Sequence, residues 1–329
     1  MSWKGWVMPA VILAAAAAVA LGVTLKKTRP QQSDASPKEM KVREAAVAGL
    51  FYPADKKALS TMIDGFLARA DAPPLENVRG LVSPHAGYEF SGPIAAYGYK
   101  QLVGRKVRAV VVMSPSHTAD FRGACIPDAD SYRTPLGTIP LSPKAKELAG
   151  IRPLITDPPC RVGRPSWWRQ SPKKAPPPDE DTPDTWEHSL EVQLPFLQKT
   201  VTDFTLVPIV FGKVDPEQVA NILKDHIDDE TILVASSDLS HYYPYEAANK
   251  MDRACVEAIC DLDIEAMNEQ EACGQGPILT LMHIAKRKGW KARLLDYRNS
   301  GDTAGDKSGV VGYAAIAFYE PPQPENKEN

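Results

Sequence analysis

The chain has 329 residues, of which 43% are hydrophobic and 24% charged, a composition typical of a globular protein with one large or two smaller domains. Its formal net charge is only −3, so no strongly basic surface is indicated and nucleic acid is excluded as an expected partner. The five cysteines include no Cys-x-x-Cys pair and are odd in number, which argues against a zinc ribbon or a disulfide scaffold.

The first residues differ from the rest of the chain. Residues 5–25 contain no charged side chain and are followed by Lys26 and Lys27, so the segment is long enough for a single-pass membrane anchor. Because Ala18-Val-Ala20 resembles a cleavage site, a removed export signal is an alternative, and a buried core helix is a third. We expect an N-terminal region, 1–40, with an uncleaved anchor and a flexible linker, and a membrane-associated protein whose side of the membrane stays open.

Beyond this region, apolar periodicity predicts helices and strands in turn. In chain order the pattern predicts a helix at 56–70, a strand at 80–83, a helix at 93–102, a strand at 108–113, an irregular hairpin over 125–141, a helix at 144–149, a Pro-rich exposed insertion at 157–184, a helix at 189–199, a strand at 205–210, a helix at 216–227, a strand at 232–235, helices at 245–260, 264–273 and 277–288, and strands at 292–297 and 310–319. This alternation is typical of a single α/β domain, 41–320, with a central, largely parallel or mixed sheet flanked by helices, followed by a polar tail, 321–329.

Three of the six histidines follow the end of a predicted strand: His85, His117 and His241. Ligands and metal ions in open α/β sheets collect beyond the carboxyl ends of the strands. Consecutive parallel strands are commonly neighbours, so we expect His85 and His117 to reach one metal ion together. The alternative is that each histidine only closes its own loop.

Further polar residues gather near these positions. Asp238 lies three residues before His241, a spacing that allows the carboxylate to orient a general-base imidazole, allows both residues to bind metal, or leaves Asp238 as a helix cap. Cys273, between two predicted helices, is a candidate thiolate ligand or nucleophile, or a buried structural cysteine. His188, next to Glu187, either orients a neighbouring group or caps a helix.

Seven segments in this order resemble the Memo family, called AmmeMemoRadiSam system protein B in prokaryotes. They are Arg43-Glu-Ala-Ala-Val-Ala-Gly-Leu-Phe-Tyr-Pro53, Pro84-His-Ala-Gly-Tyr88, Ser114-Pro-Ser-His117, Glu187-His-Ser-Leu-Glu191, Ser236-Ser-Asp-Leu-Ser-His241, Cys273-Gly274 and Tyr313-Ala-Ala. They extend over nearly all of residues 42–319, whereas the N-terminal segment and the length of the Pro-rich tract depart from the family domain.

The resemblance implies a fold similar to that of the class III extradiol dioxygenases, which bind non-haem iron through two histidines and a carboxylate. In the Memo pattern the corresponding residues are two histidines and a cysteine, which implies His85, His117 and Cys273 as metal ligands here. A thiolate in place of a carboxylate favours iron(II) or copper, leaves zinc possible, and puts ring cleavage in doubt. By the same resemblance, His241, paired with Asp238, is expected to transfer protons.

The resemblance also implies neighbours of the ligands, partners and a function. We expect His188, Glu187, Tyr88 and Ser116 to line the pocket or support the ligands. An AMMECR1-like protein and a radical-SAM protein are expected partners. The leading hypothesis is a non-haem iron or copper redox enzyme acting on an unknown small molecule; the alternatives are a non-catalytic binding or scaffold protein using the same pocket, and a zinc hydrolase.

Overall fold

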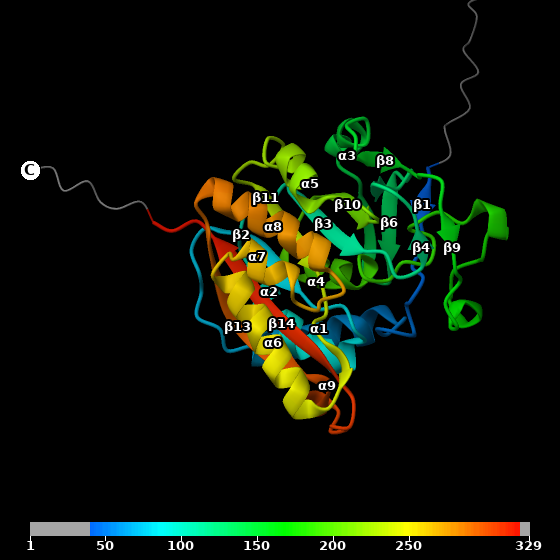
Figure 1. Cartoon of the computed structure of the whole chain (residues 1–329). Coiled ribbons are helices and arrows are strands. Elements are labelled where there is room, and N and C mark those ends of the chain that lie inside the picture. Colours follow the sequence, from blue (N-terminus) through cyan, green and yellow to red (C-terminus); the bar gives the residue numbers. More distant parts are fainter. Residues whose placement is uncertain (1–39, 323–329) are drawn as a thin grey trace, which may run out of the picture. The chain divides into compact units, whose positions relative to one another are not determined.

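A nine-stranded mixed sheet forms the centre of the part of the chain that the computed structural model describes, residues 40–322 (Figure 1). Its strands are β2 (Val78–Ser83), β3 (Ala109–Pro115), β5 (Ala124–Ile126), β8 (Leu154–Thr156), β10 (Thr205–Phe211), β11 (Thr231–Ser236), β12 (His241–Tyr243), β13 (Lys291–Asn299) and β14 (Val310–Tyr319). The order is β12-β14-β2-β11-β3-β10-β5-β8, with β13 also paired to β14. The four strands β2, β11, β3 and β10 are parallel, and antiparallel strands flank them, so the predicted α/β class with a largely parallel or mixed sheet is confirmed.

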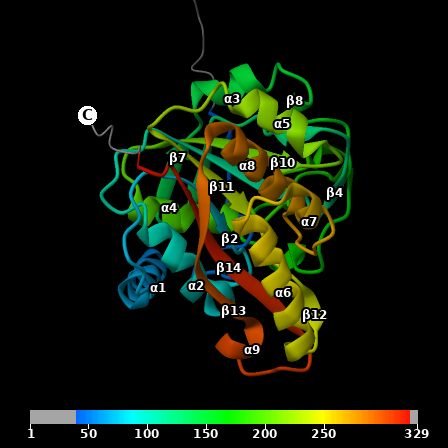
Figure 2. The ribbon, with the colours of Figure 1, turned by 60° about the vertical axis from the view of Figure 1, so that its left-hand side comes forward.

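Helices cover both faces of this sheet (Figure 2). One face is covered by α1 (Lys56–Arg69), α2 (Tyr88–Lys100) and α4 (Leu194–Thr200), and the other by α3 (Pro143–Leu148), α5 (Pro216–Leu223), α6 (Tyr245–Cys260), α7 (Ile264–Asn268) and α8 (Gln275–Lys288). The alternation of side chains along β3 shows why both layers are needed: Val110 and Val112 pack into one core, and Val111 and Met113 into the other. The remaining helical turns are α9 (Ser300–Thr303), η1 (Trp168–Gln170), η2 (Pro178–Glu180) and η3 (Glu191–Gln193).

Several helix boundaries differ from the prediction: α4 begins at Leu194 instead of residue 189, and α5 ends at Leu223 instead of residue 227. Helix α2 begins at Tyr88, so Pro93 lies inside the helix instead of opening it. Helix α7 ends at Asn268, well before the predicted end at residue 273. The Gln275 side chain donates hydrogen bonds to the carbonyl oxygens of Met267, Asn268 and Gln270, which satisfies groups that a longer helix would have used.

The strands that end at the predicted site are not arranged in sequence order. Strand β11 lies between β2 and β3, with Ser236 opposite Ser83 and Ala235 opposite Met113. The expectation that β2 and β3 are direct neighbours was therefore wrong, because a strand from much later in the chain is inserted between them. The carboxyl ends of all three strands still meet at one edge of the sheet.

Two small sheets stand beside the main one. Strands β1 (Val42–Arg43), β6 (Ser131–Thr134) and β7 (Gly137–Pro140) form the first, and β4 (Ala119–Asp120) and β9 (Arg161–Val162) the second. The second sheet joins the Pro-rich tract to the chain that follows His117. Within this tract Arg164 contacts the rings of Trp168 and Trp186, at 5.0 and 5.4 Å from their centroids. These contacts hold an irregular segment against the domain.

The predicted membrane segment requires a correction. Residues 5–25 lie outside the described part of the chain, as do residues 323–329 of the expected polar tail. Within residues 40–322 no helix is both long and apolar enough to cross a bilayer. The longest helix there, α6, has 16 residues, whereas a span needs about 20. The expectation of a single-pass anchor and of a membrane-associated protein is therefore withdrawn.

Candidate metal centre

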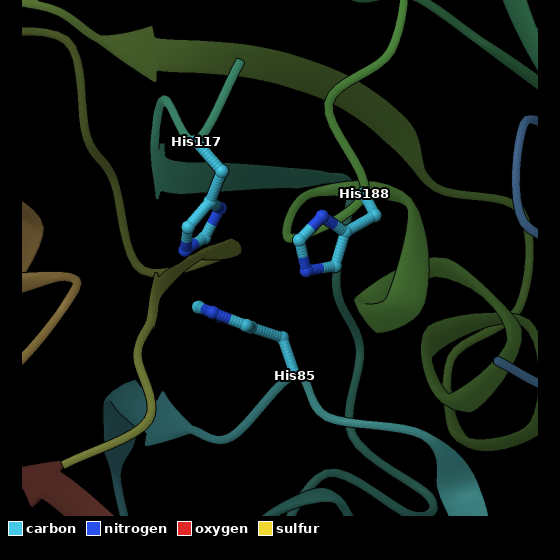
Figure 3. Close-up of side chains that lie close together, drawn as sticks. All are labelled: His85, His117 and His188. Carbon is cyan, nitrogen blue, oxygen red and sulfur yellow. The ribbon is translucent and has the colours of Figure 1, made fainter. Parts of the chain in front are cut away.

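Three histidines converge at the carboxyl edge of the parallel strands. His85 follows β2, His117 follows β3, and His188 precedes η3. One ring nitrogen from each lies within 4.8 Å of those from the other two. The ring centroids are 5.2 Å apart for His85 and His117, and 4.7 Å apart for His117 and His188. Figure 3 shows the three rings around a common space, so this cluster could hold a metal ion.

Cys273 lies directly beside this cluster. Its Sγ is 3.2 Å from Nε2 of His85. A nitrogen and a sulfur bound to one ion at about 2.1 and 2.3 Å are about 3.1 to 3.6 Å apart, so the observed spacing fits two ligands of the same ion. Gly274 allows this approach, because a Cβ there would lie 2.3 Å from the Ser236 carbonyl oxygen. The Gly274 N–H donates to Ser237 Oγ, which fixes the thiol against the end of β11.

Hydrogen bonds select the ring nitrogen that His85 offers. The Ser236 hydroxyl donates its one proton to the Ser189 carbonyl oxygen, and its Oγ accepts a hydrogen bond from Gln193 Nε2. Oγ also lies 2.8 Å from His85 Nδ1, so this contact requires a proton on Nδ1. Nε2 of His85 is thereby left with a free lone pair directed at the cluster. Burial lowers the pKa of His85 well below its usual range, which keeps the ring neutral.

A buried carboxylate orients His117. Glu187 accepts the His117 backbone N–H at 2.6 Å through Oε2, and its Oε1 lies 3.0 Å from His117 Nδ1. The same carboxylate accepts hydrogen bonds from the backbone and hydroxyl of Ser189. Although burial alone raises the pKa of Glu187, its bonds with His117 hold that pKa below its usual range. The ionised carboxylate can only accept, so Nδ1 of His117 carries a proton and Nε2 faces the cluster.

The electrostatics of the other ligand atoms follow from these contacts. Burial lowers the pKa of His117, but hydrogen bonds to Cys273 and Glu187 outweigh it and raise this pKa to about 11. Burial lowers the pKa of His188 to about 4, so this imidazole is neutral. Burial raises the pKa of Cys273. The metal-free chain therefore holds at least one exchangeable proton on the His117 and Cys273 pair, and a bound cation would displace it.

His188 is enclosed by aromatic side chains. The ring of Phe51 lies 4.7 Å from it and that of Trp167, from the Pro-rich tract, 6.5 Å from it. Its Nδ1 is buried and forms no hydrogen bond among the described residues, with the nearest Glu187 oxygen at 3.5 Å. We expected His188 to support the ligands, whereas here it is a member of the histidine cluster itself.

A buried ionic network holds the segment that carries Glu187 and His188. Arg43 donates to the Glu187 carbonyl oxygen at 2.6 Å and forms salt bridges with Glu191 and Asp184. Glu191 is fully buried and also accepts the N–H groups of Ala46 and Val47. The Arg43-to-Pro53 motif is thus packed against the Glu187-to-Glu191 motif.

The predicted pair of Asp238 and His241 is arranged differently from the expectation. Asp238 Oδ1 accepts the His85 backbone N–H at 2.7 Å, and the Asp238 N–H points to Cys273 Sγ at 3.2 Å. Burial raises the pKa of Asp238 to about 6. His241 begins β12, and its backbone N–H donates to Glu271. In the described part of the chain no hydrogen bond joins the Asp238 and His241 side chains. A positive charge on His241 nevertheless acts to lower the pKa of both Asp238 and His85.

Of the two other predicted pocket residues, Ser116 lines a cavity together with Cys273, whereas Tyr88 does not. Tyr88 lies in the core, where its hydroxyl donates to the Val192 carbonyl oxygen. Ser116 closes the turn before Ala119 through its hydroxyl. Gln193, which orients Ser236, was missed by sequence reasoning. Its place two residues after Glu191 is the only pointer to it in the sequence.

Comparison with known proteins identifies the family of the chain. The family model described as Memo-like protein matches residues 43–157 and 168–317. A MEMO1 family protein from Ignicoccus hospitalis is 35% identical over 86% of this chain and 100% of its own length. Others, from Methanopyrus kandleri and Aeropyrum pernix, are each 35% identical over 84% of this chain and 98% and 99% of their own lengths. The chain therefore belongs to the Memo family.

Proposed function

We propose that this Memo-family chain binds iron(II) or copper at the histidine cluster and oxidises a small molecule there. The observation that carries the proposal is the convergence of one ring nitrogen each from His85, His117 and His188, with Cys273 Sγ 3.2 Å from His85 Nε2. Supporting bonds to Ser236 and Glu187 direct Nε2 of the first two rings at the place a cation would occupy.

The donor set supports the choice of metal. Imidazole and thiolate are ligands of iron, copper and zinc, whereas magnesium and calcium prefer oxygen donors. Asp238, the nearest carboxylate to His85 Nε2 in the described chain, has Oδ2 at 4.0 Å and uses Oδ1 to hold the His85 backbone. We therefore assign metal binding to His85, His117 and Cys273, with His188 as a further imidazole donor.

The residues around the metal have distinct roles in this proposal. A bound iron or copper ion would supply electron transfer to or from the substrate or oxygen. Ser236 and Glu187 orient the two ligand rings. Asp238 holds the loop that bears His85. His241, half-buried at the start of β12, donates or accepts a proton at the substrate, and its position near His85 and Asp238 supports this role.

Metal analysis tests the binding step. The full chain would be purified without oxygen, loaded separately with iron(II), copper and zinc, freed of unbound metal, and analysed for metal content. The His85→Ala, His117→Ala double variant would be compared with a matched His226→Ala, His283→Ala variant, which removes two histidines outside the cluster. We expect one equivalent of iron or copper in the wild type and the control, and none in the first variant. Unchanged metal content in that variant would contradict the proposal.

Oxygen uptake tests the redox step. With ascorbate as electron donor, the loaded wild type should consume oxygen faster than the same metal bound to albumin, and His241→Asn should slow the uptake without loss of metal. If the chain retains only zinc and consumes no oxygen, the redox function is wrong and a hydrolytic function is favoured.

A further inference from the structure

Two adjoining cavities lead away from Cys273. The inner cavity has a volume of about 340 Å³ and is lined by Cys273 and by Ser116, the neighbour of His117. The outer cavity has a volume of about 680 Å³ and lies over the start of the Pro-rich tract. Both are lined by Asp120, Phe121 and Lys213. The two cavities therefore adjoin each other at these three residues, and we call the pair the groove.

The two halves of the groove differ in chemistry. Phe121, Phe211, Val214 and Pro277 give the inner cavity an apolar wall, and the two phenylalanines are 4% and 5% exposed. A hydrocarbon or aromatic body placed there would bury apolar surface against these side chains. The inner cavity therefore offers a partly apolar wall, and its two charged residues, Asp120 and Lys213, lie on the side that it shares with the outer cavity.

The outer cavity is cationic. Its charged lining consists of Arg122, Arg152 and Lys213 with a single carboxylate, Asp120, although the whole chain has a net charge of −3. Lys213 is already paired with Asp120 at 2.7 Å. Within residues 40–322 neither guanidinium forms a salt bridge to a carboxylate. Two guanidinium groups are thus available to an anion, and their planar donors match carboxylate and phosphate oxygens.

Part of this wall lies outside the ranges that the family model matches. Pro158 and Pro159 line the outer cavity, and they lie in the stretch between the two ranges that the Memo-like model matches. Strand β9, a little further along, pairs with β4, which immediately follows the His117 loop. The inserted segment therefore shapes the outer cavity and is fixed to the metal centre at the same time.

We propose that this groove binds a small organic anion, with its apolar body in the inner cavity beside Cys273 and its carboxylate or phosphate group on Arg122 and Arg152. The assignment of this anion as the substrate rests on the proposed function, because the apolar end then faces the metal ligands. Binding of the anion by the groove does not require the metal.

Matched acids and amides test the proposal. Calorimetric titration of the full chain, metal-free and metal-loaded, would use phenylalkanoic acids from phenylacetate to 6-phenylhexanoate and the corresponding neutral amides. The series varies the distance between the apolar and anionic ends. We expect at least one acid to bind about tenfold or more tightly than its amide, because guanidinium groups form stronger hydrogen bonds to a carboxylate than to a neutral amide.

Three variants locate the binding site. Arg122→Gln with Arg152→Gln should weaken binding of the acid to the level of its amide, whereas Arg253→Gln, on the exposed side of α6, should leave it unchanged. Val214→Trp should weaken binding of acid and amide alike by filling the inner cavity. The proposal is overturned if no acid binds more tightly than its amide, or if the double arginine variant binds like the wild type.

Metal content, measured on the same samples, separates this proposal from the previous one. A chain that holds iron or copper but shows no preference for acids contradicts the groove and leaves the metal function intact. A chain that holds no metal but prefers the acids through Arg122 and Arg152 contradicts the metal function and retains the anion groove.

Discussion

The two strand-end histidines of the metal centre are held by opposite kinds of support. His117 is held by a buried carboxylate, Glu187, which is itself fixed by an ionic network around Arg43. The ring of His85 is oriented by neutral groups, Ser236 and Gln193, whereas the Asp238 carboxylate binds only its backbone N–H. Both arrangements direct Nε2 at the cluster, but the pKa of His117 is raised to about 11 whereas that of His85 is lowered.

This difference shows that two ligand rings can be oriented in the same way although their pKa values are shifted in opposite directions. The charged support makes His117 a more basic ligand but gives it a proton that a cation must displace. The neutral support leaves His85 unprotonated and ready to bind. We therefore expect the support of His117 by Glu187 to control metal affinity and its pH dependence. The support of His85 by Ser236 should contribute mainly to the orientation of the ring.

The largest effect is expected from breaking the ionic network. Arg43→Met would leave Glu191 and Asp184 buried without their cation, and should lower the free energy of unfolding by about 3 to 5 kcal/mol. The matched control is Arg133→Met, because Arg133 pairs with Glu44 at the surface, where both side chains are about half exposed. That pair is worth about 0 to 1 kcal/mol. If urea unfolding showed equal losses of unfolding free energy for the two variants, the buried network would not stabilise the segment that carries the site.

Removal of the Glu187 charge should weaken metal binding next most strongly. Glu187→Gln keeps the size of the side chain but loses the ionised acceptor of His117 Nδ1, so metal affinity should fall about 10- to 100-fold. Competition with a chromophoric chelator measures this change. Glu217→Gln, which alters an exposed carboxylate paired with Arg287, should leave affinity unchanged. An unaltered affinity in Glu187→Gln would remove the distinction between the two supports.

The pH dependence of metal affinity sharpens the same distinction. In the metal-free chain His117 is protonated at neutral pH because its pKa is about 11, and the pKa of Cys273 is also raised. Each proton that the metal displaces makes affinity rise about tenfold per pH unit, so affinity should increase from pH 6 to pH 8. The slope should be smaller in Glu187→Gln, where the proton on His117 is held less strongly. A flat profile in the wild type would contradict this assignment.

The smallest loss of metal affinity is expected when the neutral support of His85 is removed. Ser236→Ala removes the hydrogen-bond acceptor of His85 Nδ1, and a neutral hydrogen bond contributes about 1 kcal/mol, so affinity should fall less than tenfold. Thr200→Val, which removes another buried hydroxyl in α4, should cost stability but not affinity. If Ser236→Ala lost more metal affinity than Glu187→Gln, the neutral support would matter more than the charged one, contrary to our expectation.

Much of the fold could be predicted because strand and helix periodicities are local. The parallel strands β2, β3, β10 and β11 all lie near their predicted places, and the residues after them mark the edge that carries the site. Their spatial order could not be predicted from sequence proximity. Strand β11 pairs with both β2 and β3, so the prediction that His85 and His117 are near one another was right although its stated reason was wrong.

Long-range contacts limited the prediction of the site. His188 precedes a short helical turn and has no strand before it, so only the packed structure brings it to His85 and His117. Gln193 acts through Ser236, which is 43 residues away in the sequence. The anion groove likewise depends on Arg122, Arg152 and Lys213, which no local pattern connects. The AMMECR1-like and radical-SAM partners stay predictions of the family resemblance.

X-ray absorption spectroscopy at the iron or copper edge of the metal-loaded protein tests the central claim most directly. We predict imidazole nitrogens at about 2.0 to 2.1 Å and one sulfur at about 2.3 Å, with the sulfur contribution lost in Cys273→Ser and imidazole scattering reduced in His117→Ala. A first shell made of oxygen alone, or a spectrum unchanged in both variants, would contradict the assignment of the metal to this cluster.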